Sequence, residues 1–124
     1  MTNLIHLHHA SIIIADTQRS LDFYCGVLGL KTDDSRPDLG YPGAWLQLGS
    51  QQIHLLQVPD PDLGRQPPEH GGRDRHIAIG VKDISAVADA LDTAAVSCVR
   101  SRSGRAALFC RDPDGNALEF IEQA

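Results

Sequence analysis

The chain has 124 residues, of which 42% are hydrophobic and 22% charged, the balance of a soluble, single-domain globular protein. Its net charge of −5, with acidic and basic residues interspersed, argues against a nucleic-acid partner. Neither an apolar run of about 18 residues nor a signal-peptide pattern is visible, so we expect no membrane association. Three cysteines without Cys-x-x-Cys spacing predict a cytoplasmic protein with reduced, mostly buried thiols.

The first half of the chain predicts a helix that follows one strand and precedes several more. Residues 7–15 contain consecutive isoleucines, which favour a strand, and Asp16 follows as a helix cap. Apolar residues recur at three- and four-residue steps over 18–28, as in an amphipathic helix, and Gly29 is suited to end it. The remaining predicted strands of this half, the last two forming a hairpin, cover residues 30–34, 44–48 and 52–58.

The second half repeats this order after a segment rich in proline and glycine. Residues 59–75 hold four of the seven prolines and have few apolar side chains, so they predict a linker or an ordered crossover. The turn Asp-Pro-Asp-Gly at 112–115 precedes the final strand. The predicted elements of this half are strands over 76–81, 96–100, 105–110 and 117–122, and a helix over 84–95.

An internal duplication is supported by the spacing of particular residues. His9 precedes Asp16 by seven residues, and His76 precedes Asp83 by the same number. An internal repeat of this kind normally reflects a repeated structural module. We therefore predict an α+β fold of two βαβββ modules within a single domain. The predicted domain covers residues 1–124, with modules 6–58 and 75–123 and a crossover over 59–74.

Four potential metal ligands occupy equivalent places in the two modules. His9 and His76 open the first strand of each module, and His54 and Glu119 lie inside the last strand of each. A single histidine beside apolar residues is normally structural. Four ligand types in matching register instead predict a site for one divalent metal ion. Three imidazoles and one carboxylate suit Zn, Ni, Co, Mn or Fe.

The other histidines are left out of this predicted site. His6 and His8 fall on the opposite face of the first strand and break the seven-residue spacing. His70 lies in the crossover, where we expect it to be exposed to solvent. Glu119 is the carboxylate of the set, and strand alternation places it on the face opposite Leu118 and Phe120.

Several motifs resemble those of the vicinal oxygen chelate superfamily, and the resemblance covers nearly the whole chain. This superfamily includes glyoxalase I, fosfomycin-resistance thiol transferases, methylmalonyl-CoA epimerase, extradiol dioxygenases and bleomycin-resistance proteins. The motifs are His9-Ala10-Ser11-Ile12, Ser20-Leu21-Asp22-Phe23-Tyr24, Leu28-Gly29-Leu30, His76-Ile77-Ala78-Ile79 and Asp112-Pro113-Asp114-Gly115-Asn116-Ala117-Leu118-Glu119.

The resemblance implies a curved mixed sheet that cups one metal ion, and a homodimer in which modules of two chains complete each site. His9, His76 and Glu119 match ligand positions of the enzymatic members, whereas His54 stands where glyoxalase I carries Glu or Gln. Glu119 is then the only ligand carboxylate, and we expect it to be the catalytic base that moves a proton next to a carbonyl.

These observations predict a metal-dependent lyase or isomerase whose small substrate is chelated through two neighbouring oxygens. The alternatives are a ring-cleaving Fe(II) dioxygenase, a fosfomycin-type thiol transferase, and a non-enzymatic drug-binding protein. A fourth protein ligand at His54 would close a position that oxygen needs in the dioxygenase.

Trp45 either lines the substrate cup or packs under a helix. Four loop arginines either bind an anionic substrate or are solvated, namely Arg73, Arg75, Arg102 and Arg105.

Overall fold

A computed structural model describes residues 2–123, and the element order follows the predicted repeat. No helix in these residues has the length and apolar character needed to cross a membrane. The first module contains β1 (His9–Ile13), α1 (Thr17–Leu21), η1 (Asp22–Val27), β2 (Lys31–Thr32), β3 (Gly43–Leu48) and β4 (Gln51–Leu56). The second contains β5 (His76–Val81), α2 (Ile84–Thr93), β6 (Cys98–Arg100), β7 (Ala107–Arg111) and β8 (Ala117–Glu122), preceded by η2 (Gly71–Arg73).

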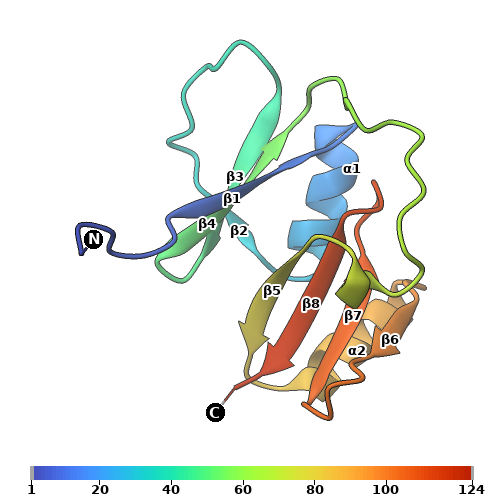
Figure 1. Cartoon of the computed structure of the whole chain (residues 1–124). Coiled ribbons are helices and arrows are strands. Elements are labelled where there is room, and N and C mark those ends of the chain that lie inside the picture. Colours follow the sequence, from blue (N-terminus) through green and yellow to red (C-terminus); the bar gives the residue numbers. More distant parts are fainter. Residues whose placement is uncertain (1, 124) are drawn as a thin grey trace.

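Each module forms its own four-stranded mixed sheet (Figure 1). The strand orders, β1-β4-β3-β2 and β5-β8-β7-β6, are equivalent, and in each sheet the first strand pairs in parallel with the last. In the first sheet Ser11 lies opposite His54, and in the second Ala78 lies opposite Glu119. Ser11 and Ala78 each stand two residues after the histidine that opens their strand, so His54 and Glu119 occupy equivalent positions in the two sheets. The α+β fold and the duplication are therefore confirmed.

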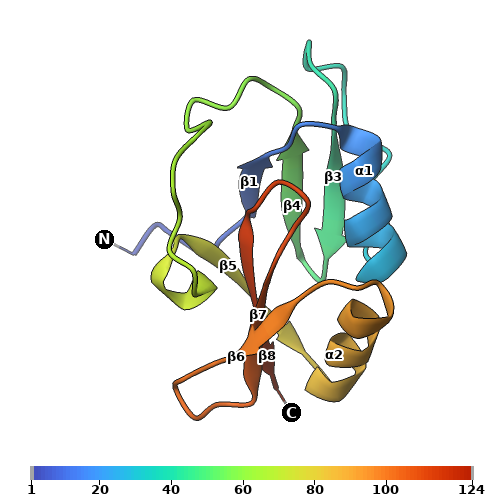
Figure 2. The ribbon, with the colours of Figure 1, turned by 90° about the vertical axis from the view of Figure 1, so that its right-hand side faces the viewer.

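α1, with η1 that continues it, and α2 lie on one side of the molecule, where they cover one face of the two sheets (Figure 2). Asp16 caps α1 by accepting from the backbone N–H of Arg19 at 2.9 Å, and Asp83 caps α2 in the same way. The helix predicted over 18–28 widens after α1 into π-helical turns, in which the Leu28 N–H donates to the Phe23 carbonyl five residues earlier.

Strand alternation separates the core from the opposite face of each sheet. Leu118 and Phe120 of β8 join the buried core with Tyr24, whereas Glu119 between them points to the other face. His54 likewise stands between two core residues of β4, namely Ile53 and Leu55. The predicted facing of Glu119 is therefore confirmed, and the predicted ligands inside both last strands lie away from the helices.

The turn before β8 joins the two modules. The Tyr24 hydroxyl donates to Asp112 at 2.7 Å, and Arg19 pairs with Asp114 at 2.6 Å. Asn116 donates from its side chain to the carbonyl of Ile13, the last residue of β1, at 3.1 Å. The strand, helix and turn are thus fixed to one another by side chains that the turn sequence supplies.

The segment between the modules is an ordered crossover. The carboxylate of Asp74, just before β5, is buried and accepts from Arg65 and Arg111 at 2.9 and 2.8 Å. Arg111 also donates to the carbonyl of Pro68 at 2.7 Å. These contacts tie the middle and the C-terminal end of the segment to β7, so of the two interpretations of residues 59–75 the structure favours an ordered crossover over a flexible linker.

Candidate functional site

The second module brings His76 and Glu119 together at the start of β5 and in the middle of β8. Nε2 of His76 lies 3.2 Å from Oε1 of Glu119. The carboxylate is 5% exposed and the imidazole 25% exposed, so the pair faces solvent from the histidine side. Nδ1 of His76 donates to the backbone carbonyl of Asp74 at 2.8 Å. This hydrogen bond assigns the tautomer and leaves Nε2 directed at the carboxylate.

A cation suits the space between these two groups. A neutral imidazole bonded through Nδ1–H presents a lone pair at Nε2, so two acceptors face each other unless a proton or another cation lies between them. Two ligands bound tetrahedrally to one ion at about 2.0–2.1 Å are themselves about 3.3 Å apart. The separation of 3.2 Å between His76 and Glu119 therefore fits two positions of a metal ligand set.

The first module stacks its two predicted ligands. The rings of His9 and His54 are 3.9 Å apart and nearly parallel, and Trp45 of β3 stacks on the other side of His54 at 4.6 Å. Trp45 lies directly opposite His54 in the sheet. It therefore lines the ligand face and does not pack under a helix. His8, which the spacing argument excluded, is bonded to His9 through the two Nδ1 atoms at 2.8 Å.

The hydrogen bonds of His54 determine its free nitrogen. Nε2 of His54 donates to Oε1 of Gln52 at 2.8 Å, and the Gln52 amide in turn donates to Asp33 at 2.8 Å. Burial lowers the pKa of His54 below its usual value, and the nearby His9 lowers it further. His54 is thus a neutral imidazole with Nδ1 available, which is the form that binds a metal.

The two pairs do not form one cluster within a single chain. Among residues 2–123, no three His, Cys, Asp or Glu side chains are grouped closely enough to hold one ion. His9 and His54 belong to one sheet and His76 and Glu119 to the other. Each pair is the equivalent of the other in the repeat, so the four predicted ligands lie in two separate pairs within one chain.

Of the four loop arginines named from the sequence, Arg105 pairs with Glu119 in the structure. Its guanidinium Nη2 lies 3.3 Å from Oε2 of Glu119, on the side away from His76. Arg73 and Arg102 line the same cavity, which has a volume of about 350 Å³. Arg75 instead pairs with Asp62 at 2.9 Å. The local sequence could not show which of the four arginines contacts Glu119, because the path of the β6–β7 loop brings Arg105 to the carboxylate.

His70 corrects another expectation. Its side chain is half-buried, not fully exposed, and its ring stands edge-on to Phe109 at 5.0 Å. Nδ1 of His70 accepts from the backbone N–H of Gly72 and so begins the short η2 helix. A Cβ on Gly71 would lie 3.3 Å from both Ala117 and Phe109, which explains the glycine there. This turn closes the cavity around His76 and Glu119.

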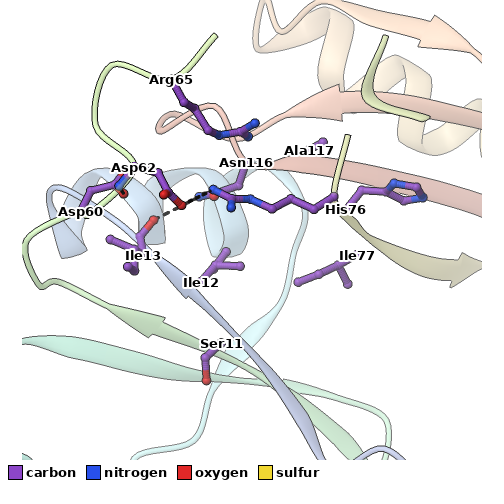
Figure 3. Close-up of a pocket in the computed structure, with 11 residues that line it drawn as sticks. Ser11, Ile12, Ile13, Asp60, Asp62, Arg65, His76, Ile77, Asn116 and Ala117 are labelled. Carbon is purple, nitrogen blue, oxygen red and sulfur yellow. Dashed lines mark hydrogen bonds and ion pairs between the residues drawn. The ribbon is translucent and has the colours of Figure 1, made fainter. Parts of the chain in front are cut away.

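A second cavity lies between β1 and β5, where the modules meet (Figure 3). Ser11 and Ile12 line one side of it, and His76 and Ile77 line the other. Of the four predicted ligands only His76 borders this cavity. The cavity described above is lined by two of them, His76 and Glu119.

Comparisons with known proteins agree with this architecture. The family model of the Glyoxalase/Bleomycin resistance protein/Dioxygenase superfamily matches residues 6–120. The chain is 32% identical to the lactoylglutathione lyase of Haemophilus influenzae, over 92% of this chain and 90% of that protein. It is also 32% identical to the uncharacterized protein YaeR of Escherichia coli, over 99% and 100% of the two chains.

Among solved structures, a Bacillus anthracis protein provisionally assigned to the glyoxalase family superposes with a TM-score of 0.81 at 22% identity and covers 100% of both chains. At this identity the superposition supports the fold alone. The family model matches nearly the whole chain and therefore shows the family as well as the fold. This chain belongs to the Glyoxalase/Bleomycin resistance protein/Dioxygenase superfamily.

Proposed function

We propose that this protein is a metal-dependent lyase or isomerase of the glyoxalase type, acting on a small substrate chelated through two neighbouring oxygens. One divalent ion would be held by His9, His54, His76 and Glu119. The observation that carries this proposal is the approach of Nε2 of His76 to Oε1 of Glu119 at 3.2 Å, with the other imidazole nitrogen already bonded to a carbonyl.

We further propose that two copies of the chain complete each site. One chain holds its four candidate ligands as two separate pairs, and a single ion needs both. β1 and β5, which carry His9 and His76, are both edge strands of their sheets. A dimer with twofold symmetry would bring the first-module pair of one copy to the second-module pair of the other, and it would create two equivalent sites.

Glu119, Trp45 and Phe109 would each have a separate role in the proposed reaction. Glu119 is the proposed base, because it is the only carboxylate in the ligand set and its two oxygens face His76 and Arg105. The ion, when bound, polarises the substrate oxygens and makes the neighbouring C–H more acidic. Glu119 then takes the proton from one carbon and returns it to the next. Trp45 and Phe109, opposite His54 and Glu119, provide the apolar floor.

Metal analysis tests the ligand set. Chelated protein is reloaded with Zn, Ni, Co, Mn or Fe(II), and the retained metal is measured by elemental analysis. We expect about one ion per chain, and its loss in His76→Ala. His70→Ala, whose side chain lines the same cavity from the crossover, is the matched control and should retain the ion. Stoichiometric metal in His76→Ala would overturn the proposed site.

Mixing two inactive variants tests the shared site. One variant carries His9→Ala and His54→Ala, and the other carries His76→Ala and Glu119→Ala. Each alone should bind no metal. After unfolding and refolding together, half of the dimers are mixed, and each mixed dimer has one intact site, so about one ion per four chains should return. A mixture that binds none would show that two copies do not share a site.

A further inference from the structure

We propose that Arg105 selects an anionic substrate for the proposed metal site. The guanidinium lies 3.3 Å from Oε2 of Glu119, while Oε1 of the same carboxylate faces His76. If an ion is held by Glu119 and His76, the guanidinium is left beside a divalent cation. The single negative charge of Glu119 then lies between a divalent cation and a guanidinium, which leaves an excess of positive charge that an anionic ligand would offset. This inference therefore rests on the proposed function and adds a substrate class to it.

The loop between β6 and β7 holds the guanidinium in place. Nε of Arg105 donates to the Ser103 hydroxyl at 3.1 Å, and the Ser103 and Ser101 hydroxyls are bonded at 2.7 Å. The backbone N–H of Arg105 also donates to Ser103, at 3.3 Å. The side chain is 57% exposed, so one face of the guanidinium stays open to a ligand. An arginine fixed in this way binds carboxylate or phosphonate oxygens in pairs.

The charge of the cavity points to the same class of substrate. Arg73, Arg102 and Arg105 line it, and of the described residues that line it only Glu119 is acidic. Three guanidiniums against one carboxylate leave an excess of positive charge before any ion is bound. A divalent ion increases that excess. The chemistry therefore favours a small anion with two neighbouring oxygens, such as a 2-hydroxy or 2-oxo carboxylate or a phosphonate, over a neutral diol.

Two chelators of different charge test this inference. Oxalate is a dianion, whereas acetohydroxamic acid is uncharged in solution and releases one proton when it chelates a metal, so that it binds as a monoanion; both present two neighbouring oxygens. Their affinities for the Ni-loaded protein are measured by calorimetry in wild type, Arg105→Gln and Arg100→Gln. Arg100 is exposed on β6, outside the cavity, and so is the matched control. We expect Arg105→Gln to weaken oxalate about tenfold and acetohydroxamate less than twofold, with Ni affinity retained or increased.

The outcomes separate this inference from the proposed function. Equal losses for both chelators, or no loss for oxalate in Arg105→Gln, would overturn the role of Arg105 while metal binding stands. A wild-type protein that holds no ion would overturn the metal site. In that case oxalate is titrated into the metal-free protein. Binding that Arg105→Gln reduces would still support an anion site, and no binding in either form would overturn it.

A separate observation concerns two cysteines on neighbouring strands. Cys98 of β6 lies directly opposite Cys110 of β7. The Ser101 N–H donates to the Ala107 carbonyl at 3.0 Å, which makes 101 and 107 a hydrogen-bonded pair. Pairs alternate along antiparallel strands, so 98 and 110 form a non-hydrogen-bonded pair, where side chains are closer. The Cα separation of such pairs, about 4.5 Å, is within the range of disulfides.

We infer that Cys98 and Cys110 form a reversible cross-strand disulfide under peroxide. Cys98 is exposed and can be reached by the oxidant, whereas Cys110 is buried beside it. Peroxide would convert the Cys98 thiol to a sulfenic acid and release one water. The Cys110 thiol would then attack that sulfur, which forms the S–S bond and releases a second water. The bond would tie the edge strand β6 to β7 at the base of the loop that carries Arg105.

Thiol counting and intact mass test the disulfide. After treatment with peroxide and unfolding, wild type should lose two of its three free thiols and two hydrogens in mass, and dithiothreitol should restore both. Cys25→Ser, the control, should behave the same with one thiol fewer. Cys98→Ser and Cys110→Ser should form no internal bond. The inference is overturned if wild type instead accumulates oxygen at Cys98, or if chains become linked to each other.

Discussion

Tyr24 and Asp112 join the two modules through a buried hydrogen bond of 2.7 Å between the phenol and the carboxylate. Tyr24 comes from the first module and is fully buried, and Asp112 begins the turn that leads to Glu119. Burial raises the pKa of Asp112 above its usual value, although hydrogen bonds from Asn116 and Tyr24 oppose this. The carboxylate is thus costly to bury, and its donors reduce that cost.

Removal of the phenol should therefore destabilise the protein. In Tyr24→Phe the carboxylate of Asp112 loses a donor while it stays buried, which should lower the free energy of unfolding by about 1–3 kcal/mol. Urea unfolding followed by circular dichroism measures the change. Tyr41→Phe is the control, because the half-buried Tyr41 ring lies against the Arg36 guanidinium and keeps that contact without the hydroxyl. Equal stability of the two variants would contradict this role.

The sequence was sufficient to predict the repeat and the strands that carry the four candidate ligands. The seven-residue spacing from His9 and from His76 to the capping aspartates is kept in the structure, where each histidine opens a strand and each aspartate caps the following helix, although β1 has five residues and β5 has six. Alternation correctly faced Glu119 away from the core. These features depend on local geometry, and the spacing and alternation of residues in a sequence predict local geometry well.

Features set by distant contacts could not be predicted. The separation of the ligands into two pairs depends on how the modules pack, which leaves no period in the sequence. Arg105 reaches Glu119 only through the path of a loop, and a loop arginine is normally solvated. Cys98 proved exposed although we expected mostly buried thiols, because β6 is an edge strand.

The crossover should make the protein sensitive to acid through Asp74. Hydrogen bonds, that from Arg65 first, hold the pKa of Asp74 well below its usual value despite burial. A lowered folded pKa adds stability that is fully present above the unfolded pKa, about 3.9, and is lost as the pH falls below it. Asp74→Asn should thus lower the free energy of unfolding by about 2 kcal/mol at pH 7. Between pH 5 and pH 2 the free energy of unfolding of the variant should fall less than that of wild type, by about the same 2 kcal/mol.

Urea unfolding at a series of pH values measures this dependence. Asp89→Asn, which changes an exposed carboxylate on α2, is the control and should follow the wild-type curve. If Asp74→Asn lost stability in parallel with wild type at every pH, the ion pairs with Arg65 and Arg111 would not be the source of the acid sensitivity.

Gln52 should position His54 for metal binding. Its Oε1 accepts from Nε2 of His54, which keeps the proton on that nitrogen and leaves Nδ1 free. Loss of such a partner typically costs a metal site about 10- to 100-fold in affinity, and we expect a loss of that order in Gln52→Ala. Gln52→Glu, which keeps the acceptor, should restore most of the affinity. Gln51→Ala is the control. Metal competition titrations would contradict the role if Gln52→Ala bound as tightly as wild type.

The only tryptophan of the chain should report on the metal directly. Trp45 stacks on His54 at 4.6 Å with the two rings nearly parallel. Coordination at Nδ1 of His54 changes the charge of that ring, and Ni or Co nearby quenches indole emission, so titration of the chelated protein should lower Trp45 fluorescence until the site is filled. The effect should disappear in His54→Ala and in His76→Ala if one ion bridges both pairs. Quenching that survives in His76→Ala would mean that the first-module pair binds metal alone, and the four-ligand site would have to be abandoned.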